Sequence, residues 1–311
     1  MPGKKLQRYY RNKLSDFKQW KHCNDASKGL IFPENLGPYL SIDETSLSQG
    51  ELYTIVTNKS AKGRKGALVA ILEGTHSDTI IPFLLQLPAK ERNKVLEVTL
   101  DLAGNMNLIV RKCFPNATIV IDRFHVQQLA TEALQEIRIQ HRWEALEQEN
   151  EAIEKAKTTK QMFNPEILIN GDTLKQLLAR SRYLLYKNEH NWTRQQADRA
   201  SILFERFPDI KLAYDLTQSL SRIYTSTTDK IYAYTRLAKW HERVEQAGFK
   251  AFNTISKTIM NHYKRILNYF DNRSTNASAE SFNAKIKDFR HNYRGVNDVN
   301  FFLFRLANLY A

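Results

Sequence analysis

Two short apolar runs, each leading into an aspartate, stand out in the hydrophobic pattern of the chain. Residues 95–100 and 118–121 are rich in β-formers, and they are followed by Asp101 and Asp122. Runs of this kind are typical of strands that are buried on both faces of a sheet. The apolar positions between them recur at the three-and-four spacing of one helical face: Met106, Ile109, Val110 and Cys113. The pattern predicts a strand, a helix and a strand, and in open α/β sheets the chemistry lies at the carboxyl ends of the strands.

Three more strand-like runs precede this unit. They are SIDETSL from Ser41, LYTIVTN from Leu52 and ALVAILEG from Ala67. The loop NKSAKGRKG joins the second run to the third, and its glycines and basic residues mark a hairpin turn. Ser77 can cap a helix that continues to Leu87. Three antiparallel-type strands, a helix, a strand, a helix and a strand follow the order of an RNase H-like mixed sheet.

A different pattern begins after the second aspartate. From residue 127 to 270 the apolar positions keep helical spacing, and no strand-like run occurs. We therefore predict an α/β mixed-sheet RNase H-like domain, residues 41–126 and 271–311, which is interrupted by an all-α insertion, residues 127–270. Residues 1–40 are predicted to form a basic N-terminal arm and a connector, and the arm either docks on the domain or contacts DNA.

The composition favours a folded protein with a polyanionic partner. The chain has 311 residues, a formal net charge of +13 and a pI near 9.6. Basic residues are interleaved with aromatic ones, as in KLQRYYRNK and HYKRILNYF, which favours a nucleic-acid-binding surface over a solvated face. The two cysteines, Cys23 and Cys113, lie far apart, so they indicate neither a zinc finger nor a disulfide framework. We find no signal peptide and no bilayer-spanning run, and we expect a cytosolic protein without a membrane partner.

Three carboxylates are candidate metal ligands: Asp43 in SIDET, Asp101 in LDLAG and Glu280 in NASAES. Two sit on predicted strands, and the third lies on a late helix that Asn276 or Ser278 can cap. A single aspartate at the end of a strand is better explained as a turn or cap residue. Together, in a basic chain, they suit Mg²⁺, which prefers oxygen ligands, and two such ions about 3.5–4 Å apart can promote phosphoryl transfer.

The late helix has two faces of different character. Its apolar face carries Phe282, Ile286 and Phe289, and its polar face carries Glu280, Asn283 and Lys287. An acid, an amide and a lysine on one stripe are unusual for a purely structural helix. Asn283 and Lys287 are therefore candidates for contacts to a phosphate backbone beside Glu280.

Four motifs together carry a family resemblance that covers nearly the whole chain from Leu14 onward. They are SIDETSLSQGELYTIVTNK, FPNATIVIDRFHVQQLA, LLYKNEHNW followed by LAYDL, and NASAESFNAKIKDFRHNYRGV. With these motifs the sequence resembles the DDE transposases of bacterial insertion sequences, whose RNase H-like domain is interrupted by a helical insertion. The resemblance implies that Asp43, Asp101 and Glu280 are the DDE triad. It also implies two Mg²⁺ ions, bridged by Asp43, with Mn²⁺ as a substitute.

Asp122 is a rival to Asp101 as the second ligand. The family and its Mutator-like relatives carry a C/D-x-x-H element after this strand, and DRFH, with Asp122 and His125, matches it. We assign Asp101, because Asp122 has neighbours that can satisfy it by an ion pair or a hydrogen bond without a metal. We expect Asp101 to lie closer to Asp43 and Glu280 than Asp122 does. His125 can ligate a metal, shuttle a proton or hold Asp122 by a hydrogen bond.

Three further residues are candidates for DNA contacts. Arg64 and Lys65 lie in the basic hairpin loop, which is either a solvated turn or a DNA contact and lacks the spacing of a phosphate-binding loop. Trp192, in KNEHNWT, either stacks on a displaced base or packs as a core or cap residue.

The resemblance implies the catalytic subunit of a transposase, which hydrolyses phosphodiesters at transposon ends and transfers the strands to target DNA. The implied partners are double-stranded DNA and further copies of the chain in a homo-oligomer, acting at the bacterial nucleoid in the cytoplasm. Related transposases carry an N-terminal zinc ribbon or helix-turn-helix, which is not visible here, so we expect either a separately encoded DNA-binding protein or a truncated copy. The alternatives are an RNase H-fold nuclease or resolvase without strand transfer, and a non-catalytic DNA-binding protein derived from a transposase.

Overall fold

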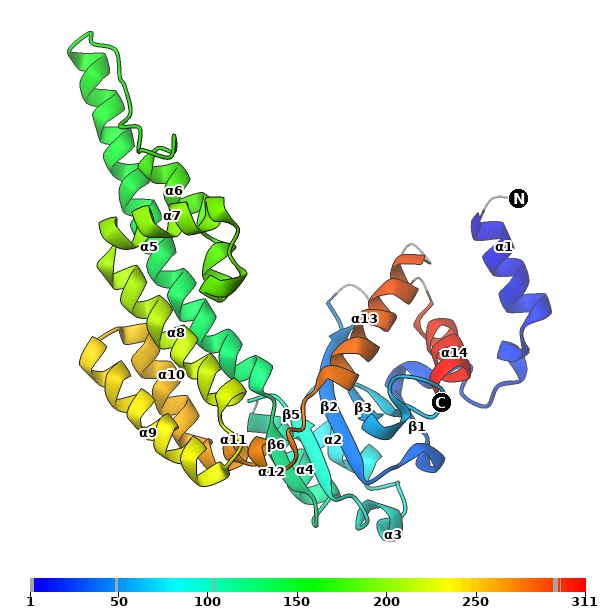
Figure 1. Ribbon diagram of the computed structural model, residues 1–311. Helices are drawn as coiled ribbons and strands as arrows, with labels where there is room; N and C mark the ends of the chain where they lie inside the picture. The colour runs from blue at the N-terminus through cyan, green and yellow to red at the C-terminus, as the bar shows by residue number, and fades with distance from the viewer. Residues whose placement is uncertain (1–2, 48–49, 103, 293–295, 297) are drawn as a thin grey trace. The chain divides into compact units, whose positions relative to one another are not determined.

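The chain forms two compact units, which we describe separately. They are Met1–Asp122 together with Asp271–Ala311, and Arg123–Phe270. The computed structural model in Figure 1 describes residues 3–47, 50–102, 104–292, 296 and 298–311. Residues 48–49, in the middle of the first sequence motif, and residues 293–295, near the end of the last one, lie outside the described residues.

The first unit is built on a sheet whose strands follow the order β1-β4-β3-β2-β5-β6. The strands are β1 (Gly29–Ile31), β2 (Tyr39–Ser46), β3 (Leu52–Asn58), β4 (Leu68–Glu73), β5 (Glu97–Leu100) and β6 (Thr118–Ile121). Neighbours from β1 to β2 pair antiparallel, whereas β2, β5 and β6 pair parallel. The order β4-β3-β2-β5-β6, with three antiparallel strands continued by two parallel ones, is the RNase H-like arrangement, and β1 adds an antiparallel edge strand. The predicted mixed sheet is confirmed.

Helices flank this sheet. They are α1 (Gly3–Tyr9), α2 (Ser77–Leu84), α3 (Ala89–Arg92), α4 (Gly104–Cys113), α13 (Ala277–Asn292) and α14 (Val299–Tyr310). The apolar stripe of α4 is buried as predicted, Cys113 included. The predicted cap at Ser77 is wrong, because α2 begins at Ser77 itself and the preceding His76 makes no side-chain capping bond.

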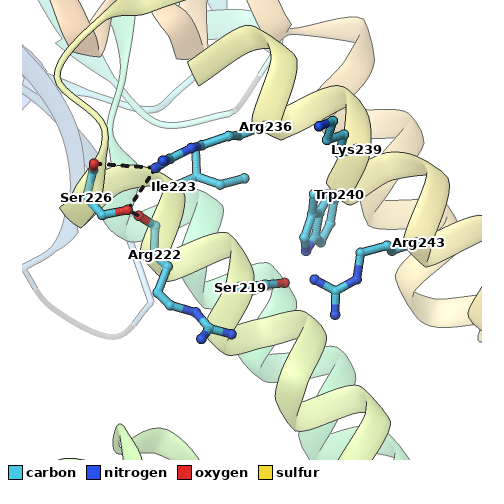
Figure 2. A pocket seen from close by; sticks show the side chains of 8 residues that line it. All are labelled: Ser219, Arg222, Ile223, Ser226, Arg236, Lys239, Trp240 and Arg243. Atoms are coloured by element: carbon cyan, nitrogen blue, oxygen red, sulfur yellow. Dashed lines mark hydrogen bonds between the residues drawn. The ribbon is translucent and has the colours of Figure 1, made fainter. Parts of the chain in front are cut away.

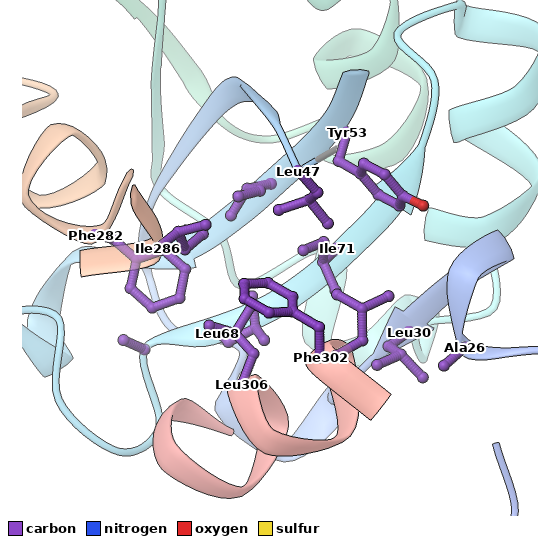
Figure 3. Packing of buried hydrophobic residues seen from close by; sticks show 13 residues of the cluster. Ala26, Leu30, Leu47, Tyr53, Leu68, Ile71, Phe282, Ile286, Phe302 and Leu306 are labelled. Atoms are coloured by element: carbon purple, nitrogen blue, oxygen red, sulfur yellow. The ribbon is translucent and has the colours of Figure 1, made fainter. Parts of the chain in front are cut away.

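The core of the unit joins segments that are far apart in sequence. Phe282 and Ile286 of α13 and Phe302 of α14 pack with Leu68 and Ile71 of β4 in one buried cluster (Figure 3). Because this cluster holds the apolar face of α13, its opposite face is directed away from the core. The predicted division of this helix into two faces is therefore confirmed.

The N-terminal segment packs on this unit. The Phe17 ring lies 5.2 Å from the Phe301 ring of α14, edge on, and Trp20 packs in the same cluster. Of the two predicted alternatives, docking on the domain and contact with DNA, the packing of these two side chains corresponds to docking. The structure differs from the predicted connector by adding strand β1, which with three residues is too short to give a periodic signal.

The second unit contains only helices and short turns in its described residues. Its helices are α5 (Arg123–Thr158), α6 (Leu174–Arg180), α7 (Arg194–Arg206), α8 (Pro208–Ser226), α9 (Lys230–Ala247), α10 (Lys250–Asn261) and α11 (Tyr263–Leu267), and α12 (Tyr269–Asn272) crosses the boundary. Asp229 caps α9 by accepting two backbone N–H groups, and Gly248, with a φ of 73°, ends it. No helix in the described parts of the chain is long and apolar enough to cross a membrane.

Candidate catalytic site

Three aspartates meet at one edge of the sheet. The last paired residues of β5 and β6 directly precede Asp101 and Asp122. On β2 and β5, the last paired residues lie two positions before Asp43 and Asp101. The parallel register therefore brings Asp43, Asp101 and Asp122 level at the carboxyl ends of three neighbouring strands, where sites in α/β sheets are built. Because β5 lies between β2 and β6, the strand of Asp101 adjoins that of Asp43, and the strand of Asp122 does not.

Asp43 is held by the late helix. The amide Nδ2 of Asn283, on α13, donates a hydrogen bond of 2.6 Å to Asp43 Oδ2, and the backbone N–H of Glu44 donates one of 2.8 Å to Oδ1. Asn283 is only 8% exposed. The sequence places Asn283 on the polar face of this helix, but it does not predict that the side chain binds Asp43 across 240 positions.

Glu44 is a fourth carboxylate at this edge, and the sequence analysis missed it. Burial raises its pKa, and the charges of Asp101 and Asp43 raise it further. The parallel register sets Asp43 and Asp101 on neighbouring strands, and the charges of both act on Glu44. The sequence SIDET places Glu44 directly after Asp43, and this adjacency could have indicated a role for Glu44. We did not predict one, because neighbouring residues of a strand point to opposite faces of the sheet.

Glu280 lies on the exposed side of α13, one turn before Asn283. One of its carboxylate oxygens lies within 4.8 Å of an oxygen of Asp122, which is 1% exposed. His125, in the first turn of α5, offers a ring nitrogen within the same distance of Asp122, its neighbour along the chain. The structure thus brings Glu280 to Asp122. The expectation that Asp101 lies nearer to Glu280 than Asp122 does stays a prediction.

Buried polar side chains precede Asp101 on β5 and form a hydrogen-bond network. Glu97 and Thr99 alternate with Asp101 along β5, so they share its face of the sheet. Lys59 Nζ donates to Glu97 Oε1 at 3.0 Å and to Thr99 Oγ1 at 2.8 Å. Asn272, shortly before α13, donates to Glu97 Oε2 at 3.3 Å. Through the bond from Asn272 to Glu97, this network connects the segment before α13 to the strand that precedes Asp101.

The candidate DNA contacts fall into two groups. Arg64, Lys65 and Lys287 are exposed and belong to the same unit as the aspartates. Trp192 is half-buried in the helical unit, where its Nε1–H donates to the Leu184 carbonyl at 2.8 Å and its ring packs 5.5 Å from Tyr214. Trp192 therefore has the contacts of a packed residue.

The donor atoms fit a hard divalent cation. Asp43, Asp101 and Glu280 offer carboxylate oxygens, which are the ligands that Mg²⁺ prefers. Asp122 and Glu280 already place two oxygens within 4.8 Å of each other. Glu44 adds a further acidic group, whose pKa is raised by burial and also by the charges of Asp101 and Asp43. A bound cation would offset the repulsion among these charges.

Comparison with known proteins shows the family of the chain. A family profile of DDE transposases of the ISL3 type, described as Transposase, matches residues 40–306. The chain belongs to this transposase family. The transposase for insertion sequence element IS1001 of Bordetella parapertussis is 26% identical over 271 residues, which are 86% of this chain and 60% of that protein. The transposase for IS1557 of Mycobacterium tuberculosis is 25% identical over 253 residues, which are 80% of this chain and 54% of that protein.

This transposase chain therefore spans somewhat more than half the length of the curated relatives that it matches. Among solved structures, the Drosophila P element transposase strand transfer complex aligns with 99% of this chain and 84% of that one, at 13% identity and a TM-score of 0.38.

Proposed function

We propose that this chain is the catalytic part of an insertion-sequence transposase. It hydrolyses one phosphodiester at each transposon end and then joins the end to target DNA. The observation that carries the proposal is the hydrogen bond from Asn283 to Asp43. This bond joins the helix that bears Glu280 to Asp43 at the sheet edge, and Asp101 follows the neighbouring strand.

The chemistry is two successive phosphoryl transfers. In the first, the oxygen of a water molecule bonds to phosphorus while the bond to the 3′ oxygen breaks, and that oxygen gains a proton as the free 3′-hydroxyl. In the second, this hydroxyl oxygen bonds to a phosphorus of the target while a target 3′ oxygen leaves. The second step exchanges one phosphodiester for another, so it needs no energy source.

Asp43, Asp101 and Glu280 would hold two Mg²⁺ ions, with Mn²⁺ as a substitute. The ions, when bound, activate the attacking oxygen and stabilise the leaving one. Asn283 holds Asp43 in one orientation by its 2.6 Å hydrogen bond. Asp122 supports Glu280 from the end of the neighbouring strand, and His125 follows Asp122 in the DRFH motif.

The basic residues near this edge hold the DNA in this proposal. Lys287 is exposed on α13 two turns after Glu280, so it can bind a phosphate of the strand being cut. Arg64 and Lys65, exposed in the hairpin loop, can bind phosphates further along. These contacts are independent of base sequence, and recognition of the transposon ends is left to another region or to a separately encoded protein.

The proposed partners are the transposon-end duplex, the target duplex and further copies of this chain, because two ends must be joined together. A protein that acts on chromosomal DNA in a bacterium works at the nucleoid, and we place this chain there.

A strand-transfer assay tests the function. The inverted repeats that flank the reading frame give the end sequence, and a duplex with a pre-cleaved 3′-hydroxyl is incubated with plasmid, Mg²⁺ and the chain. We expect joined products from the wild type and none from Glu280→Gln. Asp288→Asn is the matched control, since it removes one exposed charge from the same helix. Cutting of uncleaved ends without any joining would instead identify a nuclease or resolvase, and DNA binding without either reaction would identify a non-catalytic relative.

A further inference from the structure

The helical unit carries a basic groove outside the candidate catalytic site. It lies between α8 and α9 and has a volume of about 320 Å³ (Figure 2). Four cationic side chains line it: Arg222 from α8, and Arg236, Lys239 and Arg243 from α9. All four are exposed. On α9 they recur at three-and-four spacing, so they form one stripe along the helix.

The positive charge of this groove is uncompensated within the described part of the chain. None of the four cations forms an ion pair with a described acidic side chain. Arg236 is nevertheless held in place, because its guanidinium donates to Ser226 Oγ at 2.9 Å and to Thr227 Oγ1 at 2.7 Å. Cations that are positioned and unpaired favour an anionic ligand.

The floor of the groove indicates which part of a nucleic acid it accepts. Trp240 is 2% exposed, and its Nε1–H already donates to the Leu216 carbonyl at 2.9 Å, so its ring cannot stack on a base. The hydroxyls of Ser219 and Ser226 donate to carbonyls of their own helix. Arginine and lysine therefore supply the donors that face a ligand, and they suit phosphate oxygens rather than the mixed donors and acceptors of base edges.

The dimensions favour a chain of phosphates over a single one. Arg236 and Arg243 are two turns apart on α9, which corresponds to about 10 Å along the helix axis. One DNA strand carries a phosphate for every ~3.4 Å of duplex axis, so the stripe spans about three phosphates. A free nucleotide or inorganic phosphate would leave part of it unpaired.

We propose that this groove binds the phosphate backbone of DNA without reading its sequence. The proposal rests on the proposed function for the identity of the nucleic acid. It assigns the helical insertion a holding role, apart from the sheet edge that carries the carboxylates.

The test compares a groove variant with a matched variant of the same unit in the full chain. Arg222→Gln/Arg243→Gln removes one cation from each wall. Lys250→Gln/Lys257→Gln removes two exposed lysines from α10, which lie two turns apart on one face and outside the groove. Binding of a random-sequence fluorescent duplex is measured by anisotropy over a series of salt concentrations. Circular dichroism melting checks that each variant folds.

We expect the slope of log K against log salt to become shallower by about 2 in the groove variant and to keep its wild-type value in the α10 variant. The charge-preserving variant Arg222→Lys/Arg243→Lys should restore the slope, which separates charge from folding. An unchanged slope in the groove variant, or an equal loss in both neutral variants, overturns the groove assignment.

Two further outcomes are informative. If the wild-type chain binds no DNA at low salt, the proposed function itself is wrong. If the wild type shows a steep salt slope and the groove variant keeps the same slope, only this inference is wrong. ATP is titrated directly as the free-nucleotide probe. Suppose that the wild type binds ATP, that the groove variant does not, and that the salt slope of DNA binding is the same for both. The groove is then a nucleotide site, and the backbone proposal is wrong.

Discussion

Asn283 is a positioning residue in this account, because it is expected to act on the reaction only through Asp43. Its amide is nearly buried and donates a 2.6 Å hydrogen bond to that carboxylate. Side chains that orient metal ligands in this way typically contribute 10–100-fold to metal affinity or activity.

Asn283→Ala should therefore raise the Mg²⁺ concentration for half-maximal cleavage by about 10–100-fold. A merely structural role would lower activity at every Mg²⁺ concentration without moving that midpoint. Direct Mn²⁺ binding, followed by calorimetry, gives a second readout that does not need DNA. An unshifted midpoint together with wild-type Mn²⁺ affinity would remove Asn283 from the site.

Asp172 shows how a buried charge is stabilised in the helical unit. Its carboxylate is 1% exposed and accepts hydrogen bonds from Arg199, at 2.9 Å, and from Arg180. Burial alone raises the pKa of Asp172, but the hydrogen bonds and charges of Arg199 and Arg180 outweigh it, so the pKa lies below its usual range. The ionised form is thus favoured by folding.

This pKa predicts an acid-sensitive contribution to stability. Since the folded pKa is below the unfolded one of about 3.9, the contribution is complete above that pH and is lost as the pH falls through the folded value. Asp172→Asn should cost about 1–3 kcal/mol at neutral pH, and its stability should depend less on pH below about 4. Circular dichroism melts at several pH values measure this, with the exposed Asp198→Asn as control. Identical acid profiles for Asp172→Asn and the wild type would refute it.

At the scale of elements, α13 links core packing to the site. Phe282 is fully buried among β3, β4 and α14, while Glu280 and Asn283 on other faces of the same helix reach the aspartates. Lys285 adds an anchor by donating to the Gly63 carbonyl at 2.7 Å. Packing on one face of α13 therefore sets where its acidic and amide groups lie.

Phe282→Ala should lower the free energy of unfolding by about 3–5 kcal/mol, because it leaves a cavity in this cluster. Lys287→Ala, at an exposed position of the same helix, should change it by about 0.5 kcal/mol or less. Urea denaturation gives both values. A loss below about 1 kcal/mol for Phe282→Ala would mean that the cluster does not hold the helix.

The elements show where sequence reasoning succeeds and fails. The apolar runs before Asp101 and Asp122 and the stripe of α4 follow from periodicity, so the mixed sheet and the edge where these aspartates lie could be predicted. The stripe of α13 predicts which residues share a face, but it does not name their partners. The bonds of Asn283 to Asp43 and of Lys59 to Glu97 join residues far apart in sequence, and the tertiary fold alone sets them.

At the scale of the whole molecule, the net charge of +13 is spread over both units. Cations that neutralise DNA phosphates release counterions, so affinity falls as salt rises. We expect binding of this chain to random duplex to weaken steeply with salt and to vary little with sequence. Anisotropy titrations on two unrelated duplexes measure both properties. Tight, salt-insensitive and sequence-specific binding would reveal a recognition surface that this account lacks.

The central claim is that Asp43, Asp101 and Glu280 hold the metal ions that drive strand cleavage. Mg²⁺-titrated cleavage of a transposon-end duplex by Asp101→Asn and Asp122→Asn distinguishes the two aspartates, which end neighbouring strands, and Asp122 has an oxygen within 4.8 Å of a Glu280 oxygen. We expect no cleavage by Asp101→Asn at any Mg²⁺ concentration and reduced cleavage by Asp122→Asn. Cleavage by Asp101→Asn at saturating Mg²⁺, with none by Asp122→Asn, would contradict it and make Asp122 the second ligand.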